Sequence, residues 1–253
     1  MRSRLLLASA AAGAVLLAGC AAPWNRGAQP EPAPVSTEDA TATSEALALL
    51  RLGNNFVETR FRTDLDVGGL VTTVAWTDNP RRRFEATLKA SGRVIELRGV
   101  GDAVFLKPGG AVPGVADGWY RLDPARVPRN FAIDFTPGHN DPGGSDRLID
   151  AIVSAQVSGR VISGTIDLAK IGVGIGISIP TPDGGFPERA HHQLFDATLD
   201  DRGYLIRFEL PISDSADAVL QYGDFGTPVD VEAPPGAPSA PEALYALLGS
   251  PGA

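Results

Sequence analysis

Two hydrophobic periods alternate along the chain and divide it into helical and extended segments. From Thr37 to Gly53, apolar residues recur at helical spacing behind an acidic first turn, which predicts an amphipathic helix lying on a larger body. From Arg60 the period changes to two, which is typical of strands with one buried and one solvated face. The sequence therefore predicts a sheet that begins directly after the helix.

The first half of this sheet is predicted to be a meander of short antiparallel strands. Its turns are marked by Gly68-Gly69, Asp78-Asn79-Pro80, Ser91-Gly92 and Gly101-Asp102, and a further strand follows at residues 119–122. We expect the apolar residues at alternate positions of these strands to share the inward face of the sheet. These inward positions are Phe61, Leu65, Val67, Val74, Trp76, Phe84, Leu88, Ile95 and Leu97.

The second half adds an inserted helix, more strands and a closing helix. Ser145 and Asp146 are expected to cap the inserted helix, which carries Ile149 and Ile152 on its covering face. The further strands are expected at residues 157–168, 192–199, 204–211 and 218–222, and the closing helix at residues 241–249. This order predicts an α+β fold in which a few helices cover the concave face of a single curved antiparallel β-sheet.

One segment between the later strands has an unusual alternation. In the run from Ile171 to Ile179, every odd position is β-branched and apolar, and Gly172, Gly174 and Gly176 occupy even positions. Such glycines allow close approach of a bound guest or of a neighbouring backbone, and the pattern alone leaves both interpretations open.

Composition narrows the class of protein. The 253 residues include 29 glycines and 21 prolines, more than helix interiors tolerate, so a helical bundle is disfavoured. The hydrophobic fraction of 43% is sufficient for a sizeable core. The formal net charge of −8 repels phosphate backbones, so we expect no nucleic-acid partner.

The N-terminus has the features of an export signal with a lipid-attachment site. Arg2 and Arg4 precede a short apolar run that ends in Leu17-Ala18-Gly19-Cys20, which resembles the bacterial lipobox. Cys20 is the only cysteine, and lipidation there would add the two acyl chains that stable membrane anchoring requires. We therefore expect a lipid-anchored protein on the outer face of the cytoplasmic membrane, in the cell envelope.

This interpretation divides the chain into four parts. Residues 1–19 are predicted to be a lipoprotein signal peptide, and residues 20–36, rich in proline and alanine, a lipidated tether. Residues 37–233 are predicted to form the folded body, and residues 234–253 a proline-rich C-terminal segment with a short helix.

The titratable residues give no pattern of catalysis or metal binding. His191 and His192 are adjacent, and neighbouring residues of a strand point to opposite faces, so they are poorly placed to chelate one ion. The chain has no Gly-x-Ser-x-Gly elbow and no Rossmann or Walker spacing. We expect no catalytic residue, no metal and no cofactor, although His139 or His192 within reach of an aspartate would leave room for a degenerate hydrolase.

The predicted sheet has more apolar surface than the predicted helices can cover. The predicted helices are too few and too short to cover every strand, so two outcomes remain open. Either the sheet closes on itself around a filled core, or part of its concave face stays open for an apolar guest.

Several segments together resemble a known family of lipoproteins. They are the lipobox, the first helix with its meander, Phe105-Leu-Lys, residues 119–126, the hairpin at Asp201-Arg202-Gly203 and the closing run Tyr222-Gly-Asp-Phe-Gly-Thr-Pro-Val-Asp-Val-Glu-Ala-Pro234. The chain is similar in these segments to the LppX/LprAFG lipoproteins of mycobacteria and related actinobacteria. The resemblance implies a half-barrel like that of the LolA/LolB carriers, closed by helices over an apolar cavity.

The same resemblance implies a function and a site. A member of this family is expected to carry or transfer an acylated lipid or lipoglycan and to be no enzyme, with an envelope transporter as a possible protein partner. Because an acyl chain gains nearly the same free energy in an apolar cavity as in a bilayer, exchange needs no fuel. The candidate cavity-lining residues are the nine inward positions given above, joined by Ile149 and Ile152 from the covering helix. The alternative is a membrane-anchored interaction or regulatory module with a filled core and no ligand.

Overall fold

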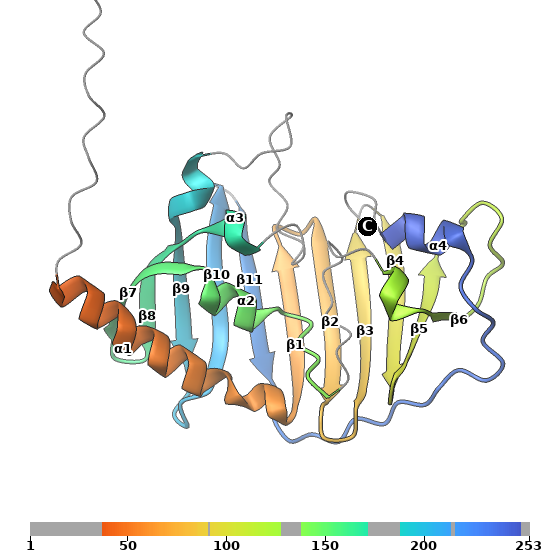
Figure 1. Ribbon diagram of the computed structural model, residues 1–253, viewed down its shortest axis with the longest axis horizontal. Coiled ribbons are helices and arrows are strands. Elements are labelled where there is room, and N and C mark those ends of the chain that lie inside the picture. The colour runs from red at the N-terminus through yellow and green to blue at the C-terminus, as the bar shows by residue number, and fades with distance from the viewer. Residues whose placement is uncertain (1–36, 91, 128–137, 172–187, 214–215, 249–253) are drawn as a thin grey trace, which may run out of the picture. The chain divides into compact units, whose positions relative to one another are not determined.

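One antiparallel sheet of 11 strands is the framework of the chain (Figure 1), in the order β6-β5-β4-β3-β2-β1-β11-β10-β9-β8-β7. It is not closed into a barrel, because β6 and β7 form two separate edges. The strands are β1 Arg60–Val67, β2 Val71–Asp78, β3 Arg83–Ala90, β4 Arg93–Val100, β5 Ala103–Gly109, β6 Tyr120–Leu122, β7 Ile152–Ser158, β8 Val161–Ile166, β9 Gln193–Leu199, β10 Leu205–Ser213 and β11 Ala216–Gly223.

The computed structural model describes residues 37–90, 92–127, 138–171, 188–213 and 216–248, all within one unit of the chain, residues 36–253. Its helices, including three short 3-10 helices named η, are α1 Thr37–Gly53, η1 Asn54–Glu58, η2 Pro124–Arg126, α2 Ser145–Asp150, α3 Leu168–Ile171, η3 Glu188–His192 and α4 Glu242–Leu248. The predicted signal peptide, Cys20, the tether and Gly172, Gly174 and Gly176 lie outside the described residues.

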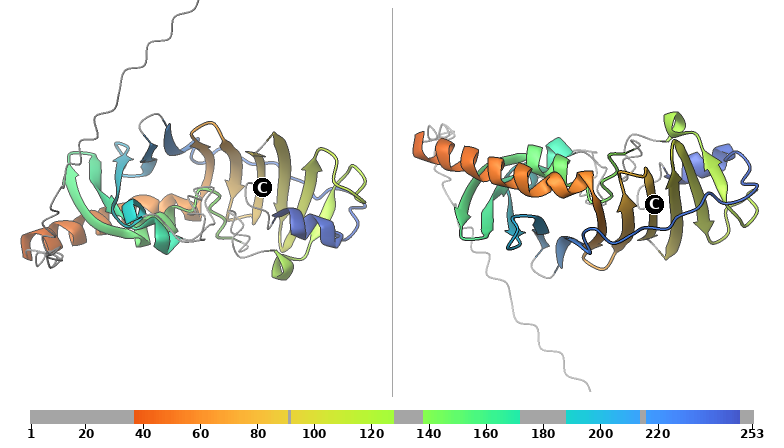
Figure 2. Two further views of the ribbon diagram at one scale, coloured as in Figure 1. Left: turned by 90° about the horizontal axis from the view of Figure 1, so that it is seen from above. Right: turned by 90° about the horizontal axis from the view of Figure 1, so that it is seen from below.

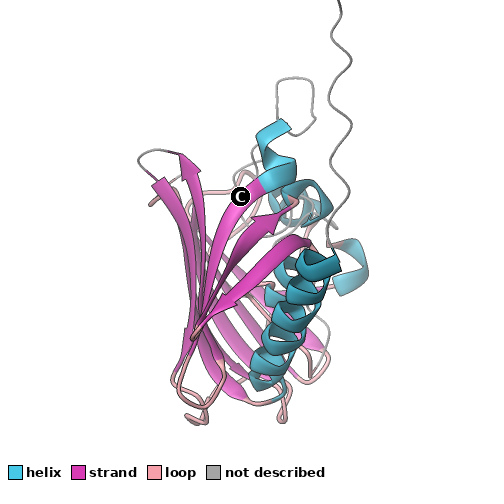
Figure 3. Cartoon of the chain, turned by 90° about the vertical axis from the view of Figure 1, so that its left-hand side faces the viewer, coloured by secondary structure: helices cyan, strands magenta, loops and turns pink. Residues whose placement is uncertain are grey.

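The sheet curves, and α1 to α4 lie on one side of it (Figures 2 and 3). We call the side that carries the helices the inner face and the opposite side the outer face. β1 and β11 are neighbours at the centre of the sheet, so the chain runs outward from β1 to β6 and returns from β7 to β11. Because β6 and β7 are opposite edges, the connection between them must cross the sheet, and residues 138–144 with α2 are a described part of that crossing.

Alternation of apolar and polar residues correctly predicted the faces of most strands. In β1, Phe61, Leu65 and Val67 are buried on the inner face, with Arg60 and Asp64 on the outer face. The first helix, the meander and the closing helix also lie where the sequence predicts them, within one or two residues. The coarse prediction of one large antiparallel sheet with a few helices is confirmed.

The predicted face of β2 is wrong. Directly opposite residues of an antiparallel pair point to the same side, and Leu65 pairs with Thr73 while Phe61 pairs with Thr77. The inner face of β2 therefore carries threonines and Ala75, and Val74 and Trp76 lie on the outer face. Val74 is 39% exposed, and Trp76 lies beside Arg62, whose guanidinium carbon is 5.7 Å from the ring centroid.

Two further predictions are corrected at element boundaries. Ile152 does not belong to the covering helix, because α2 ends at Asp150 and Ile152 begins the edge strand β7. His191 and His192 end the short helix η3 and do not start a strand, so the argument from opposite strand faces does not apply to them.

Both edges of the sheet are covered by other parts of the chain. At β7, the Thr43 hydroxyl of α1 accepts a hydrogen bond from the Ala155 N–H at 3.2 Å. At β6, residues 238–240 run alongside Arg121, whose N–H donates to the Pro238 carbonyl at 2.7 Å. Exposed edges are sites of unwanted strand pairing, so these contacts protect the open sheet. The segment after residue 233 is thus packed against the same body.

Candidate functional site

The inner face is buried beneath the helices in two hydrophobic clusters of buried residues, and the half-buried Val71 of β2 packs against both of them. The first contains the inner residues of β1 and of β7 to β11 with side chains of α1, α2 and α3, and the second contains those of β2 to β6 with side chains of α4. Each of these helices contributes buried residues to one cluster only. The boundary between the clusters, which we call the seam, therefore runs between β1 and β2.

Nine of the eleven predicted cavity-lining residues are buried in these clusters, and Val74 and Trp76 are not. Those in the first cluster are Phe61, Leu65, Val67, Ile149 and Ile152, and those in the second are Phe84, Leu88, Ile95 and Leu97. Burial alone does not distinguish a ligand-facing wall from a packed core.

The cavity detected on the inner face is small. It measures about 10 Å³ and lies between α2 and the sheet, where Leu148 approaches Leu65, Phe208 and Leu220. That volume holds about one water molecule. This cavity is therefore too small for an acyl chain.

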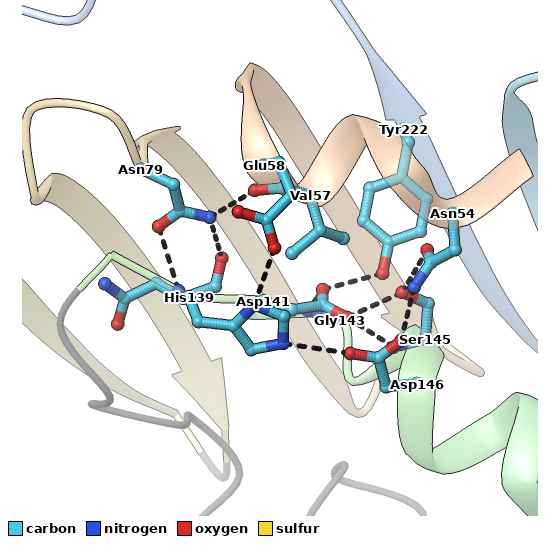
Figure 4. Close-up of polar contacts among 11 residues, drawn as sticks. Asn54, Val57, Glu58, Asn79, His139, Asp141, Gly143, Ser145, Asp146 and Tyr222 are labelled. Atoms are coloured by element: carbon cyan, nitrogen blue, oxygen red, sulfur yellow. Dashed lines mark hydrogen bonds and ion pairs between the residues drawn. The ribbon is translucent and has the colours of Figure 1, made fainter. Parts of the chain in front are cut away.

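A buried carboxylate fixes the crossing segment to the sheet (Figure 4). Asp141 Oδ1 accepts hydrogen bonds from the Tyr222 hydroxyl at 2.8 Å and from the Gly143 N–H at 3.0 Å. Its Oδ2 accepts from the Ser145 N–H at 2.6 Å. Burial, followed by the neighbouring Asp141 carboxylate, raises the pKa of Tyr222 well above its usual value, so the hydroxyl stays protonated and donates.

The same carboxylate is connected to η1 through α2. Ser145 Oγ lies 2.6 Å from both Asp141 Oδ2 and Asn54 Oδ1, and its one hydrogen can be donated to only one of them at a time. Asn54 Nδ2 donates to Asp146 Oδ1 at 2.7 Å. These residues, Asn54, Asp141, Ser145, Asp146 and Tyr222, are called the Asp141 network below.

Gly143 is required by this arrangement. A Cβ at this position would lie 2.3 Å from the Tyr222 hydroxyl oxygen and 2.5 Å from Leu220 Cδ1. Carbon atoms do not approach other heavy atoms that closely, so only glycine lets the crossing segment lie this near to β11.

His139 joins the network to η1 at the surface. Its Nε2 lies 3.1 Å from Asp146 Oδ2, and its Nδ1 lies 3.2 Å from Glu58 Oε1. Partial burial lowers the pKa of His139, but hydrogen bonds and charge attraction from Asp146 and Glu58 outweigh it, and the pKa is raised above its usual value. Protonation of the ring therefore strengthens both contacts.

Next to this network, two buried hydroxyls have no hydrogen-bond partner among the residues that the structure describes. They belong to Thr63 of β1 and Thr77 of β2, which are both 0% exposed. Thr63 pairs in register with Ala75 on one side and with Tyr222 on the other, so both threonines lie at the seam. Buried hydroxyls are nearly always hydrogen-bonded, but the pair is not alone, since the buried Arg62 Nε and Asn140 Oδ1 atoms also make no hydrogen bond in the described part of the chain.

The outer face carries a shallow groove of about 600 Å³ at the β1–β2 hairpin and β11. Asp64, Asp66 and Asp217 line it, together with Arg207 and the exposed Val74. The groove is therefore mixed in charge and open to solvent, in contrast to the apolar inner face.

His139 lies within reach of an aspartate, Asp146, which is the condition that the sequence set for a degenerate hydrolase. The contacts of Ser145 Oγ are with Asp141 and Asn54, and both ring nitrogens of His139 are occupied by carboxylates. His191 contacts Asp167 at 3.0 Å, away from any of these groups in the hydrogen-bond network. In the described part of the chain, no three His, Cys, Asp or Glu side chains are grouped to hold a metal ion.

Sequence reasoning missed the threonine pair and the network. Thr63 lies at an inward position between Phe61 and Leu65, so a polar residue in an apolar series was a visible signal. Nothing local indicated the network, since Tyr222 and Asp141 are 81 residues apart in the chain.

Comparisons with known protein families and curated proteins do not assign this chain to a family. No protein-family model matches the chain, and a search of curated proteins found no match. In the ranges that the structure describes, none of the helices has the length and apolar character for a bilayer crossing.

Proposed function

We propose that this protein is a lipid-anchored carrier of the cell envelope, which binds an acylated lipid on the inner face of its sheet and releases it without catalysis. The observation that carries the proposal is the seam. An open apolar sheet face is covered by two helix groups that share no helix, and buried hydroxyls without partners lie where the two groups meet.

This arrangement suits reversible uptake of an acyl chain. Separating the two clusters along the seam would expose apolar wall on both sides, at a cost that an acyl chain offsets at about 0.8 kcal/mol per buried methylene. In this proposal, the structure with its small cavity is the closed state, and the covering helices take another position when the inner face is occupied.

The resemblance of several segments to the LppX/LprAFG lipoproteins supports the same proposal. Tyr222, the first residue of the most specific run in that resemblance, also donates a hydrogen bond to Asp141. Residues 1–36, with Cys20, would supply the anchor, and the described body would supply the carrier.

The test uses the full chain with Cys20→Ser, so that any lipid found is bound noncovalently. After mild purification, native mass spectrometry should show an added mass that organic extraction removes and identifies as an acylated lipid. A chain that is folded and carries no extractable lipid, and takes none up from vesicles, would contradict the proposal.

A second candidate, an interaction module, is favoured by one observation. The mixed-charge groove of about 600 Å³ lies on the outer face, at the β1–β2 hairpin and β11. If the lipid test is negative, this groove is the place to look for a protein partner such as an envelope transporter. Charge reversal at Asp64 and Asp217 would then abolish that binding and leave the inner face unchanged.

A further inference from the structure

The unpartnered hydroxyls of Thr63 and Thr77 indicate which kind of lipid the inner face accepts. Both atoms are fully buried and lie on adjacent paired strands, with Thr63 diagonal to Thr77 because Thr63 pairs with Ala75. Diagonal neighbours on one face of an antiparallel pair are about 7–8 Å apart, so two short side chains there can contact one group only if it lies between them. The pair therefore presents two hydroxyl donors at one place on an apolar wall.

We propose that Thr63 and Thr77 donate hydrogen bonds to the ester carbonyl of a bound acyl chain and thereby select an uncharged ester over an ether or a free carboxylate. This inference rests on the proposed function and names the residues that would determine its ligand specificity. An ester carbonyl needs donors only, and each hydroxyl can supply one.

The surroundings of the pair argue against a charged carboxylate. Their neighbours on the same face, by register and by strand spacing, are Phe61, Leu65, Ala75, Asn79, Phe84 and Tyr222, and none of these carries a positive charge. An ionised group buried without a counterion is strongly disfavoured. Asp141, which accepts from Tyr222, would repel a second carboxylate.

The position of the pair fits an ester with an acyl chain attached. Apolar wall extends from the threonines into both clusters, with Leu65 on the β1 side and Ala75 and Phe84 on the β2 side. A chain leaving an ester held at the seam would thus continue along apolar residues in either direction.

A buried hydroxyl whose only hydrogen-bond partner is a ligand lowers the stability of the ligand-free protein. Replacing a buried, unpartnered hydroxyl with a methyl group of the same shape is close to neutral or stabilising. Removing a hydroxyl that has a partner inside the protein, including an ordered water, is destabilising instead. The two roles therefore predict opposite changes in melting temperature.

The experiment compares two probes that differ only at the carbonyl: monooleoylglycerol and its ether analogue, oleyl glyceryl ether. The full chain with Cys20→Ser, freed of lipid, should bind the ester more tightly than the ether. Thr63→Val and Thr77→Val should each weaken ester binding about two- to tenfold, the equivalent of one net hydrogen bond, and leave ether binding unchanged. Their lipid-free melting temperatures should equal or exceed that of the parent.

Thr87→Val is the matched control, because Thr87 lies on the outer face of β3, opposite Val74 in register. It should not change the preference for ester over ether. Equal binding of ester and ether by the parent, or an unchanged preference in the double valine variant, would overturn the inference and leave the carrier proposal standing. A lower melting temperature in both valine variants would also overturn it. Binding of neither probe by the parent would overturn both proposals.

Discussion

Tyr222 and Thr63 lie directly opposite each other on neighbouring strands, yet the fold treats their hydroxyls differently. The Tyr222 hydroxyl donates to Asp141, whose carboxylate also accepts from two backbone N–H groups. The Thr63 hydroxyl, equally buried, has no partner. Buried polar groups with hydrogen-bond partners stabilise one structure, whereas buried polar groups without partners destabilise it. We therefore look for a second role for the groups without partners.

The comparison assigns the two regions different roles. The Asp141 network holds the crossing segment and α2 against β11. The hydroxyls of the threonine pair make no hydrogen bond among the described residues, and we propose that they serve a ligand. Variants at the two places should therefore affect stability and binding in opposite ways.

The largest effect is expected from Asp141→Ala. This change leaves the Tyr222 hydroxyl and the N–H groups of Gly143 and Ser145 without their acceptor, at about 1–3 kcal/mol for each buried group. We expect the free energy of unfolding in urea to fall by more than about 3 kcal/mol. Asp102→Ala is the control, since Asp102 forms an exposed ion pair with Arg82, typically worth about 0–1 kcal/mol. Equal losses in the two variants would contradict a structural role for the network.

Tyr222→Phe should cost less, because Asp141 keeps its other donors. Hydrogen bonds to charged groups contribute about 1.5–3 kcal/mol, and we expect a loss of unfolding free energy in that range. Thr63→Val, measured in the same way, should show no loss. The comparison between the two roles fails if the threonine variant is destabilised as much as the tyrosine variant.

Gly143→Ala tests the close approach of the crossing segment to β11. The added methyl group would meet the Tyr222 hydroxyl and Leu220, and overpacking of this kind costs about 1–3 kcal/mol. Gly223→Ala is the control, because nothing lies within 4 Å of a Cβ there. Thermal unfolding of both chains checks this, and an alanine at position 143 that leaves the melting temperature unchanged would show that the segment is not held so closely.

The smallest effect is expected at His139 and depends on pH. Its pKa is raised in the folded protein, so its contribution is fully present below the unfolded pKa of about 6.5 and is lost as pH rises through the folded value. The ring is 46% exposed on its side chain, so screening limits the effect to about 0.2–1 kcal/mol. The unfolding free energy of the parent relative to His139→Gln should fall between pH 6 and pH 8. A difference that stays constant or rises would contradict the geometry.

Local pattern was sufficient to predict most of the sheet. In β1, apolar residues recur at every second position except Thr63, and the strand is observed with the expected face inward. In β2, threonines at inward positions interrupt the apolar series. Val74 and Trp76 on the outer face, together with Leu70 in the turn, form a second apolar series, which pattern alone takes for the inner one. Cross-strand pairing with β1 decides the face, and pairing is not visible in a single strand.

The site depends on contacts that sequence spacing does not contain. The partners in the Asp141 network come from η1, the crossing segment, α2 and β11, with 81 residues between Asp141 and Tyr222. Ile152 illustrates the same limit at short range: its apolar neighbours continue the helical period of α2, yet pairing with Ile166 makes it the start of an edge strand. Tertiary pairing overrides local periodicity at both places.

The central claim, that the inner face at the seam binds the lipid, is tested most directly by two adjacent tryptophan variants. Ala75 is fully buried on the inner face between Thr63 and Ala86, and Val74 lies on the outer face. In the full chain with Cys20→Ser, Ala75→Trp should abolish the extractable lipid, and Val74→Trp should retain it. Ala75→Leu gives the same comparison with less added bulk if the tryptophan variant does not fold. Equal amounts of lipid in folded Ala75 and Val74 variants would contradict the account.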